Sequence, residues 1–195
     1  MIFATGNRHK LAEMVELLPA LDLKPLPAGL EMPPEDGDSF EANALIKARA
    51  VQRATGEVVL ADDSGIEAED LGGEPGIFSA RYAGIGVGDE VNLAKLLHEV
   101  DAAGGGRRAA YVCALALIDA DGDEHVFEAR CEGRLLRERR GEGGFGYDPA
   151  FVPDETDDER TMSELSAAEK NAISHRGRAA RLLEAHLAGA GRGPG

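Results

Sequence analysis

Apolar residues recur along the chain with two different periods, which predict strands and helices in turn. Short apolar runs at 2–4 and 58–61 predict buried strands. Later runs separated by Asp-Gly or Gly turns predict an antiparallel meander, with strands at 111–118, 124–131 and 133–138. A further strand is possible at 21–26. Helical spacing of apolar positions predicts helices at 11–18, about 40–55, 91–100 and around 182–187.

The strand at 58–61 leads directly into Asp62-Asp63-Ser64-Gly65, where we expect a turn. Ligands of α/β proteins gather at the carboxyl ends of strands, because loops there can be polar while the sheet stays dry. Two adjacent buried carboxylates repel each other unless a cation or a shared proton offsets them. A solvated acidic turn is the alternative, and this stretch alone favours neither.

The first strand enters the loop Thr5-Gly6-Asn7-Arg8-His9-Lys10, and a helix follows. This layout points backbone N–H groups and the positive end of the helix dipole at an anion. Lys10 adds a compact charge suited to phosphate. The loop lacks the Walker pattern, so an ordinary strand-to-helix turn remains the simpler interpretation.

An acidic, proline-containing loop at 31–38 precedes the second helix, which Asp38 or Ser39 can cap. Its carboxylates, Glu35 among them, are ordinarily just solvated. Lys47 lies close to the packing stripe of the helix. Its side chain either snorkels to solvent or points into a cleft.

Two late segments combine glycine, aromatic and charged residues. Gly143 to Pro149 reads GGFGYDP, a flexible loop in which Phe145 either stacks on a base or packs in the core. Ser166 and Glu169 form a capping box for a helix that carries Lys170. The glycine-rich tail at 189–195 is expected to be disordered.

Length and charge limit the classes of function. The 195 residues fit one domain, with room for two lobes. A net charge of −15 disfavours binding to a nucleic-acid polymer, so a site for an anion needs local cations or a metal. No run reaches the ~20 apolar residues of a membrane span. The two cysteines, Cys113 and Cys131, have no CxxC spacing and are expected to be buried free thiols in a reducing cytoplasm.

Five motifs stand in order along nearly the whole chain: TGNRHK, ADDSG, GGEPGIFSARY, GGFGYDPAF and EKNAISHR. Together they resemble the inosine triphosphate pyrophosphatase family, which hydrolyses non-standard purine nucleoside triphosphates to the monophosphate and pyrophosphate. The resemblance implies an α/β fold with an elongated mixed central sheet flanked by helices and two lobes around an active-site cleft. It also implies one catalytic domain over 1–188, dependence on Mg²⁺, and a homodimer.

The resemblance also assigns roles. Thr5 to Lys10 match the triphosphate loop, with Asn7 and Lys10 as phosphate ligands, and Lys47 matches the cleft lysine. Asp63 matches the general base and metal ligand, with Asp62 and Ser64 beside it. Glu35 matches the metal-binding glutamate; Glu41 is less suitable, because Ala42 stands where many members carry a Glu before the helix Asn. The nucleoside-recognition set corresponds to Phe145, Gly146, Tyr147, Asp148, Lys170, His175 and Arg176.

The residue chemistry agrees with these roles. A triphosphate carries about four negative charges, which Mg²⁺ and cations from separated segments would offset. Mg²⁺ takes one or two carboxylates plus phosphate oxygens and waters, and Glu35 and Asp63 suit it. Two alternatives stay open. One is a pyrophosphatase for modified pyrimidine nucleotides, and the other is a non-catalytic nucleotide-binding regulator.

Overall fold

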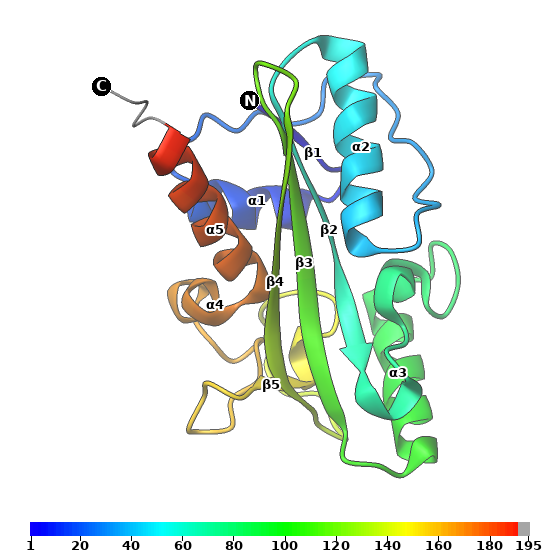
Figure 1. Cartoon of the computed structure of the whole chain (residues 1–195). Helices are drawn as coiled ribbons and strands as arrows, with labels where there is room; N and C mark the ends of the chain where they lie inside the picture. Colours follow the sequence, from blue (N-terminus) through cyan, green and yellow to red (C-terminus); the bar gives the residue numbers. More distant parts are fainter. Residues whose placement is uncertain (191–195) are drawn as a thin grey trace. The chain divides into compact units, whose positions relative to one another are not determined.

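The computed structural model describes residues 1–190 and shows an α/β protein with a mixed five-stranded sheet flanked by helices (Figure 1). The strands lie in the order β1-β2-β3-β4-β5, and they span β1 Ile2–Ala4, β2 Val59–Ala68, β3 Arg108–Ile118, β4 Glu124–Leu135 and β5 Phe151–Pro153. The α-helices are α1 Arg8–Leu17, α2 Phe40–Thr55, α3 Asp89–Ala103, α4 Ala167–Ile173 and α5 His175–Ala190. Short 3₁₀ helices occupy Glu69–Leu71, Gly76–Arg81 and Asp148–Ala150. Strand β1 pairs with β2 in parallel, and β4 pairs with β5 antiparallel.

The chain divides into two compact units, and the boundaries between them fall inside β2, β3, β4 and α5. Unit 1 comprises Met1–Asp63, Cys113–Ala129 and Arg176–Gly195, of which residues 191–195 lie outside the described part. Unit 2 comprises Ser64–Val112 and Arg130–His175. Strands β2, β3 and β4 therefore contribute residues to both units.

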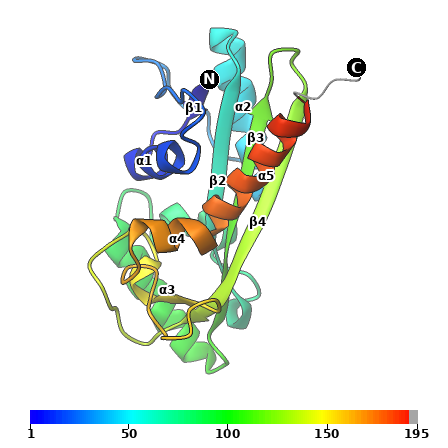
Figure 2. The ribbon, with the colours of Figure 1, turned by 90° about the vertical axis from the view of Figure 1, so that its left-hand side faces the viewer.

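In unit 1, α1 and α5 cover one face of the sheet and α2 lies on the opposite face (Figures 1 and 2). Alternate residues of a strand point to opposite faces. The core under α1 and α5 accordingly collects alternate strand residues with helix residues, namely Phe3, Leu60, Cys113, Leu115, Leu117, Met14, Leu18, Ala179, Ala180 and Leu183. The strand alternation thus decides which helix each β2 side chain meets.

Unit 2 has its own core. It packs the apolar stripe of α3, Leu93, Leu96 and Val100, against strand residues that include Ile66 and Phe151. Tyr111 and Tyr147 belong to the same buried cluster. Each of these buried rings carries a hydroxyl group, which needs a hydrogen-bond partner.

Two predictions placed the ends of strands wrongly. Strand β2 does not stop at Asp62 but continues to Ala68, so the two aspartates lie within a strand rather than in a turn. The runs predicted at 124–131 and 133–138 form one strand, β4, which continues through Gly133 and ends at Leu135, so residues 136–138 are not in a strand. A Cβ at Gly133 would meet the Val152 carbonyl and come within 2.6 Å of the Phe151 ring, so this glycine admits β5 rather than making a turn.

The segment predicted as a possible strand at 21–26 forms only one isolated bridge, between Ile2 and Lys24. Helix α5 extends to Ala190, so the predicted tail loses its first two residues to a helix. The remaining tail residues, 191–195, lie outside the described part of the chain.

The helix ends agree with the sequence signals. Ser39 caps α2 by accepting a hydrogen bond from the Ala42 N–H, so of the two candidates Ser39 rather than Asp38 is the cap. The capping box of Ser166 and Glu169 opens α4 as predicted.

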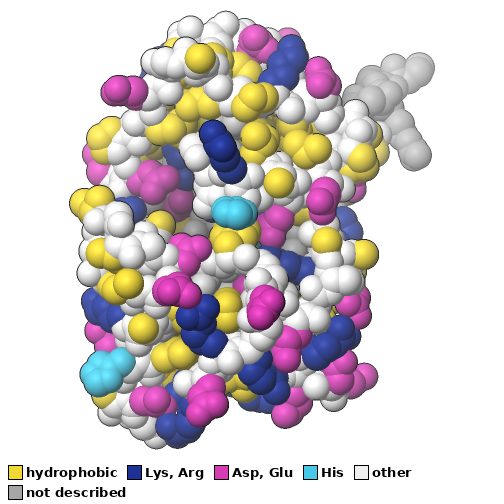
Figure 3. Space-filling view, turned by 180° about the vertical axis from the view of Figure 1, so that it is seen from behind, with side chains coloured by type: hydrophobic (Ala, Val, Ile, Leu, Met, Phe, Trp, Pro, Cys, Tyr) yellow, Lys and Arg dark blue, Asp and Glu magenta, His cyan; other side chains and the backbone are white. Residues whose placement is uncertain are grey.

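The predicted burial of the two cysteines is confirmed, since both are buried thiols. Within residues 1–190, no helix is long and apolar enough to cross a membrane. On the face shown in Figure 3, Asp and Glu side chains lie among Lys and Arg side chains.

Candidate functional site

The loop after β1 is held by its own side chains. Thr5 Oγ1 accepts from the Asn7 N–H at 3.1 Å. Asn7 caps α1, because its Oδ1 accepts from the N–H groups of His9 at 2.9 Å and Lys10 at 3.3 Å. Gly6, Asn7, Arg8 and His9 are exposed. The start of α1 therefore faces solvent in a fixed conformation, as an anion site requires.

Asp62 and Asp63 point to opposite faces of β2. Asp62 meets Lys10 of α1, with Nζ 2.9 Å from Oδ2. Asp63 meets α2 instead, where Lys47 Nζ lies 3.0 Å from Oδ1 and Asn43 Nδ2 lies 3.3 Å from Oδ2. The two carboxylates are buried, yet each is offset by its own cation, which removes the need for a shared proton.

Lys47 joins two carboxylates from different segments. Its Nζ lies 2.7 Å from Glu35 Oε1 as well as 3.0 Å from Asp63 Oδ1. The lysine is buried, so its side chain does not snorkel to solvent. Burial would lower the pKa of Lys47, but the charges of Asp63, Asp62 and Glu35 outweigh burial and raise it. Lys47 thus stays a cation between two carboxylates.

Burial raises the pKa of Asp63 above its ordinary value, while Lys47 and Lys10 act in the opposite direction and Glu35 adds to the rise. The neighbouring carboxyl behaves differently. Burial would raise the pKa of Asp62, but the charges of Lys10, Arg176 and Lys47 outweigh burial and lower it. Asp63 is therefore the better proton acceptor of the two, and Asp62 is the more firmly ionised.

Asn43 is a site residue that the sequence reasoning did not assign. It is fully buried, donates to Asp63, and accepts from the Gly37 N–H at 2.9 Å. A Cβ at Gly37 would come within 2.8 Å of Asn43 Oδ1, so this position in the acidic loop needs glycine. The four-residue spacing of Asn43 and Lys47 on one face of α2 was the available signal.

Arg176 lies with the residues of unit 1. Its Nη1 is 2.9 Å from Glu13 Oε2 on α1, and its Nε is 3.5 Å from Asp62 Oδ2. Lys10 and Arg176 therefore share the Asp62 carboxylate. We name this set of unit 1 residues the Asp63 cluster; it comprises Lys10, Glu35, Asn43, Lys47, Asp62, Asp63 and Arg176.

A second set, in unit 2, gathers around Asp148. Lys170 Nζ lies 2.7 Å from Asp148 Oδ2, and the Phe145 N–H donates to the same oxygen at 3.0 Å. The Tyr111 hydroxyl donates to Asp148 Oδ1 at 3.0 Å, and the Tyr111 ring stacks on the imidazole of His175. Lys170 Nζ also lies 5.1 Å from the centre of the Phe145 ring. We name these five residues the Asp148 cluster.

The structure thus divides the predicted nucleoside-recognition set. Asp148, Phe145, Lys170 and His175 are together, whereas Arg176 belongs to the Asp63 cluster. Gly146 donates its N–H to Asp89 at 2.8 Å. The Tyr147 hydroxyl donates to the Ser79 carbonyl at 2.6 Å, inside unit 2.

The predicted site residue Ser64 follows Asp63 in β2 and begins unit 2.

The sequence reasoning did not assign Tyr111 to the site, because nothing distinguishes a tyrosine in an apolar strand from an ordinary core residue.

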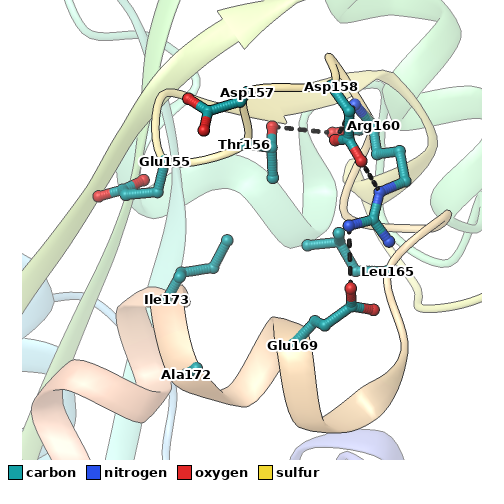
Figure 4. Close-up of a pocket in the computed structure, with 9 residues that line it drawn as sticks. All are labelled: Glu155, Thr156, Asp157, Asp158, Arg160, Leu165, Glu169, Ala172 and Ile173. Atoms are coloured by element: carbon teal, nitrogen blue, oxygen red, sulfur yellow. Dashed lines mark hydrogen bonds and ion pairs between the residues drawn. The ribbon is translucent and has the colours of Figure 1, made fainter.

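A pocket of about 390 Å³ in unit 2 contains none of the predicted site residues (Figure 4). Its lining comprises Glu155, Thr156, Asp157, Asp158, Arg160, Leu165, Glu169, Ala172 and Ile173. The single cation, Arg160, is paired with Asp158 and with Glu169. A pocket with four carboxylates repels a polyphosphate, so we do not regard it as the substrate site.

No three His, Cys, Asp or Glu side chains among residues 1–190 are arranged to hold a metal ion by themselves. Glu35 and Asp63 nevertheless converge on one cation, the Lys47 ammonium. Mg²⁺ takes only one or two carboxylates when phosphate oxygens and waters complete its shell. The pair of carboxylates therefore fits Mg²⁺ bound together with a polyphosphate.

Comparison with known proteins gives a consistent result. The Ham1 family matches residues 1–186. A protein of Corynebacterium diphtheriae named dITP/XTP pyrophosphatase is 44% identical over 97% of each chain. The protein of that name from Mycolicibacterium paratuberculosis is 48% identical, over 94% of this chain and 93% of its own. The structure of a HAM1 protein from Coxiella burnetii matches with a TM-score of 0.86 and 40% identity, covering 96% of this chain and 97% of that one. The chain therefore belongs to the Ham1 family, and the family resemblance seen in its five motifs is confirmed.

Proposed function

We propose that this protein is a nucleoside triphosphate pyrophosphatase that hydrolyses the non-standard purine nucleotides ITP, dITP and XTP to the monophosphate and pyrophosphate, with Mg²⁺ as cofactor. The names of its relatives support the reaction and the substrates. The observation that carries the proposal is the position of Lys47 between Glu35 and Asp63, at 2.7 and 3.0 Å. A nucleotide-binding regulator has no need of two carboxylates held at one point.

Asp63 is the general base in this proposal. Its carboxylate accepts a proton from the water that attacks Pα, and its raised pKa makes it a better proton acceptor than an ordinary aspartate. Lys47 and Asn43 each hold one carboxylate oxygen, which fixes the direction of the group. As water bonds to Pα, the bond to the bridging oxygen breaks and pyrophosphate leaves.

Glu35 and Asp63 would hold the Mg²⁺ ion, which when bound supplies positive charge to the phosphate oxygens and the leaving group. The remaining charge is met by side chains of this chain. Lys10 and Lys47 bring cations to a substrate with about four negative charges, and the start of α1 adds its dipole. Electrostatic stabilisation by groups already in place is the main source of acceleration in such a reaction.

The Asp148 cluster is proposed to recognise the base. Inosine and xanthosine carry a C6 oxygen, which accepts hydrogen bonds, whereas adenosine carries an amino group, which donates them. Lys170 is a donor only, and a protonated His175 is too. Such groups accept the oxo base and leave the adenine amino group facing another donor, which sites of this kind reject strongly. Phe145 supplies a ring for stacking on the base.

We further propose, from the resemblance, that residues 1–188 act as one catalytic domain, that the protein works as a homodimer, and that it acts on the nucleotide pool of the cytoplasm. Small-molecule nucleotides, rather than nucleic-acid polymers or membranes, are the proposed partners, because the net charge of −15 opposes binding to polyanions.

Hydrolysis of ITP in ¹⁸O-labelled water tests the reaction. With Mg²⁺, we expect ¹⁸O in IMP and none in pyrophosphate, because water attacks Pα. Mass spectrometry of the products gives the answer, with ATP, GTP and modified pyrimidine triphosphates as comparison substrates. Orthophosphate as the first product would overturn the choice of bond. Faster turnover of a pyrimidine substrate would favour the pyrimidine alternative, and binding without turnover would favour a regulator.

A further inference from the structure

Tyr111 contacts both Asp148 and His175, two residues of the proposed base site. The residue lies in β3, is buried, and belongs to unit 2 with all of its partners named here. Its hydroxyl donates to Asp148 Oδ1 at 3.0 Å. Its ring lies parallel to the His175 imidazole, with 4.5 Å between ring centres and 3° between the planes. Phe151 supports the same ring edge-on at 4.8 Å.

Asp148 is already engaged by the protein itself. Its Oδ1 accepts from Tyr111, and its Oδ2 accepts from Lys170 Nζ and from the Phe145 N–H. Asp148 is only 3% exposed. A carboxylate held by three donors from three segments has little capacity left for a substrate. Asp148 therefore acts chiefly on its neighbours, by setting the positions of Lys170 and of the loop that carries Phe145.

Stacking on the Tyr111 ring also constrains His175. A parallel ring at 4.5 Å fixes the plane of the imidazole and hence the direction in which its ring nitrogens point. Tyr111 thus bears on every member of the Asp148 cluster, through its hydroxyl for Asp148, Lys170 and Phe145, and through its ring for His175. Phenylalanine at this position would keep the ring and lose the hydroxyl.

We propose that Tyr111 is a positioning residue that determines selectivity for 6-oxopurine bases. It holds Asp148 and His175 in the geometry in which Lys170 and His175 present donors to the C6 oxygen. The inference rests on the proposed function and deepens it, because it concerns how the base is selected. The proposed proton acceptor, Asp63, belongs to a different cluster.

The test compares Tyr111→Phe with Tyr82→Phe. Tyr82 is a matched control, because it lies in the same unit and its hydroxyl also donates to a carboxylate, that of Glu99, outside the Asp148 cluster. For Tyr111→Phe we expect KM for ITP to rise about tenfold while kcat stays within about twofold, and the ratio of kcat/KM for ITP over ATP to fall about tenfold. Tyr82→Phe should change none of these values.

Binding of IMP, measured by calorimetry, provides a readout independent of turnover, and Tyr111→Phe should weaken it about tenfold. Tyr111→Leu, which also removes the stacked ring, should weaken it further. Circular dichroism and the melting temperature establish that each variant is folded. An unchanged ITP/ATP ratio and IMP affinity in folded Tyr111→Phe would overturn the role of Tyr111, as would an equal loss of kcat for both nucleotides.

The wild-type products separate the two proposals. If the wild type fails to release IMP and pyrophosphate from ITP, the proposed function falls and the role of Tyr111 falls with it. If the wild type is active and Tyr111→Phe behaves like it, only the inference about Tyr111 is lost.

Discussion

Asp62 and Asp63 are adjacent in the chain, yet their chemistry differs because alternate strand residues face opposite ways. Asp62 meets Lys10 and Arg176, which lower its pKa despite burial. Asp63 meets Lys47 and Asn43, and burial raises its pKa. The first carboxylate is therefore suited to anchoring cations and the second to accepting a proton.

The Asp63→Asn variant tests this division of roles. We expect kcat for ITP to fall about a hundredfold or more, because the change removes the charge that accepts the proton and binds the metal, while KM changes less. Asp36→Asn is the control, since Asp36 is an exposed carboxylate of the same unit. Steady-state kinetics with a melting curve decide the matter. Near-normal turnover by Asp63→Asn would show that another group is the base.

At the scale of elements, α2 holds the acidic loop before it in a fixed position. Ser39 caps the helix, and one helical turn later Asn43 accepts from Gly37 in the loop. The next turn brings Lys47 to Glu35 and to Asp63 of β2. A loop that would otherwise be a solvated acidic stretch is thereby fixed with one carboxylate aimed at the strand.

These contacts between α2 and the loop predict which glutamate binds metal. Glu35→Gln should weaken Mg²⁺ or Mn²⁺ binding in the presence of IMP and pyrophosphate by about tenfold or more, because a carboxylate ligand is lost. Glu41→Gln is the matched control, as Glu41 is exposed on the first turn of the same helix. Calorimetric titration with the metal measures both. Equal weakening by the two variants, or a loss confined to Glu41→Gln, would contradict the assignment of Glu35.

At the scale of the whole molecule, the two units have separate cores but share strands. Cys113 is buried in the core of unit 1, and Cys131 in the core of unit 2. Burial raises the pKa of the Cys113 thiol to about 12. The thiolate is the reactive form, so a buried thiol of this kind reacts only after its surroundings open.

Each thiol therefore reports on one unit. At pH 8 in increasing urea, we expect iodoacetamide to label Cys113 and Cys131 at the same midpoint, because β2, β3 and β4 contribute to both units and couple their unfolding. Mass spectrometry of the peptides distinguishes the two sites. The unfolded protein in high urea serves as the control for full labelling. Midpoints that differ clearly would show that the units unfold independently and would contradict a single cooperative domain.

The sequence by itself determined the features that depend on local chemistry. Periodicity placed the helices and most strands, and side-chain capping placed the starts of α2 and α4. The ordered motifs identified the family, because five short patterns in series are specific where each alone is weak. Both cysteines fall in strand-like runs, which predicted their burial.

Tertiary structure alone decided which charged groups meet. Strand β2 continues through Asp62 and Asp63 since cations on α1, α2 and α5 offset their charges. Helices α1 and α5 are distant from β2 in the chain. Gly133 lies within β4 because β5 approaches it closely, which a local turn signal does not reveal. Tyr111 and Asn43 joined the candidate site for the same reason. Their roles come from partners 37 and 20 residues away, and contacts at that separation are fixed by packing rather than by local sequence.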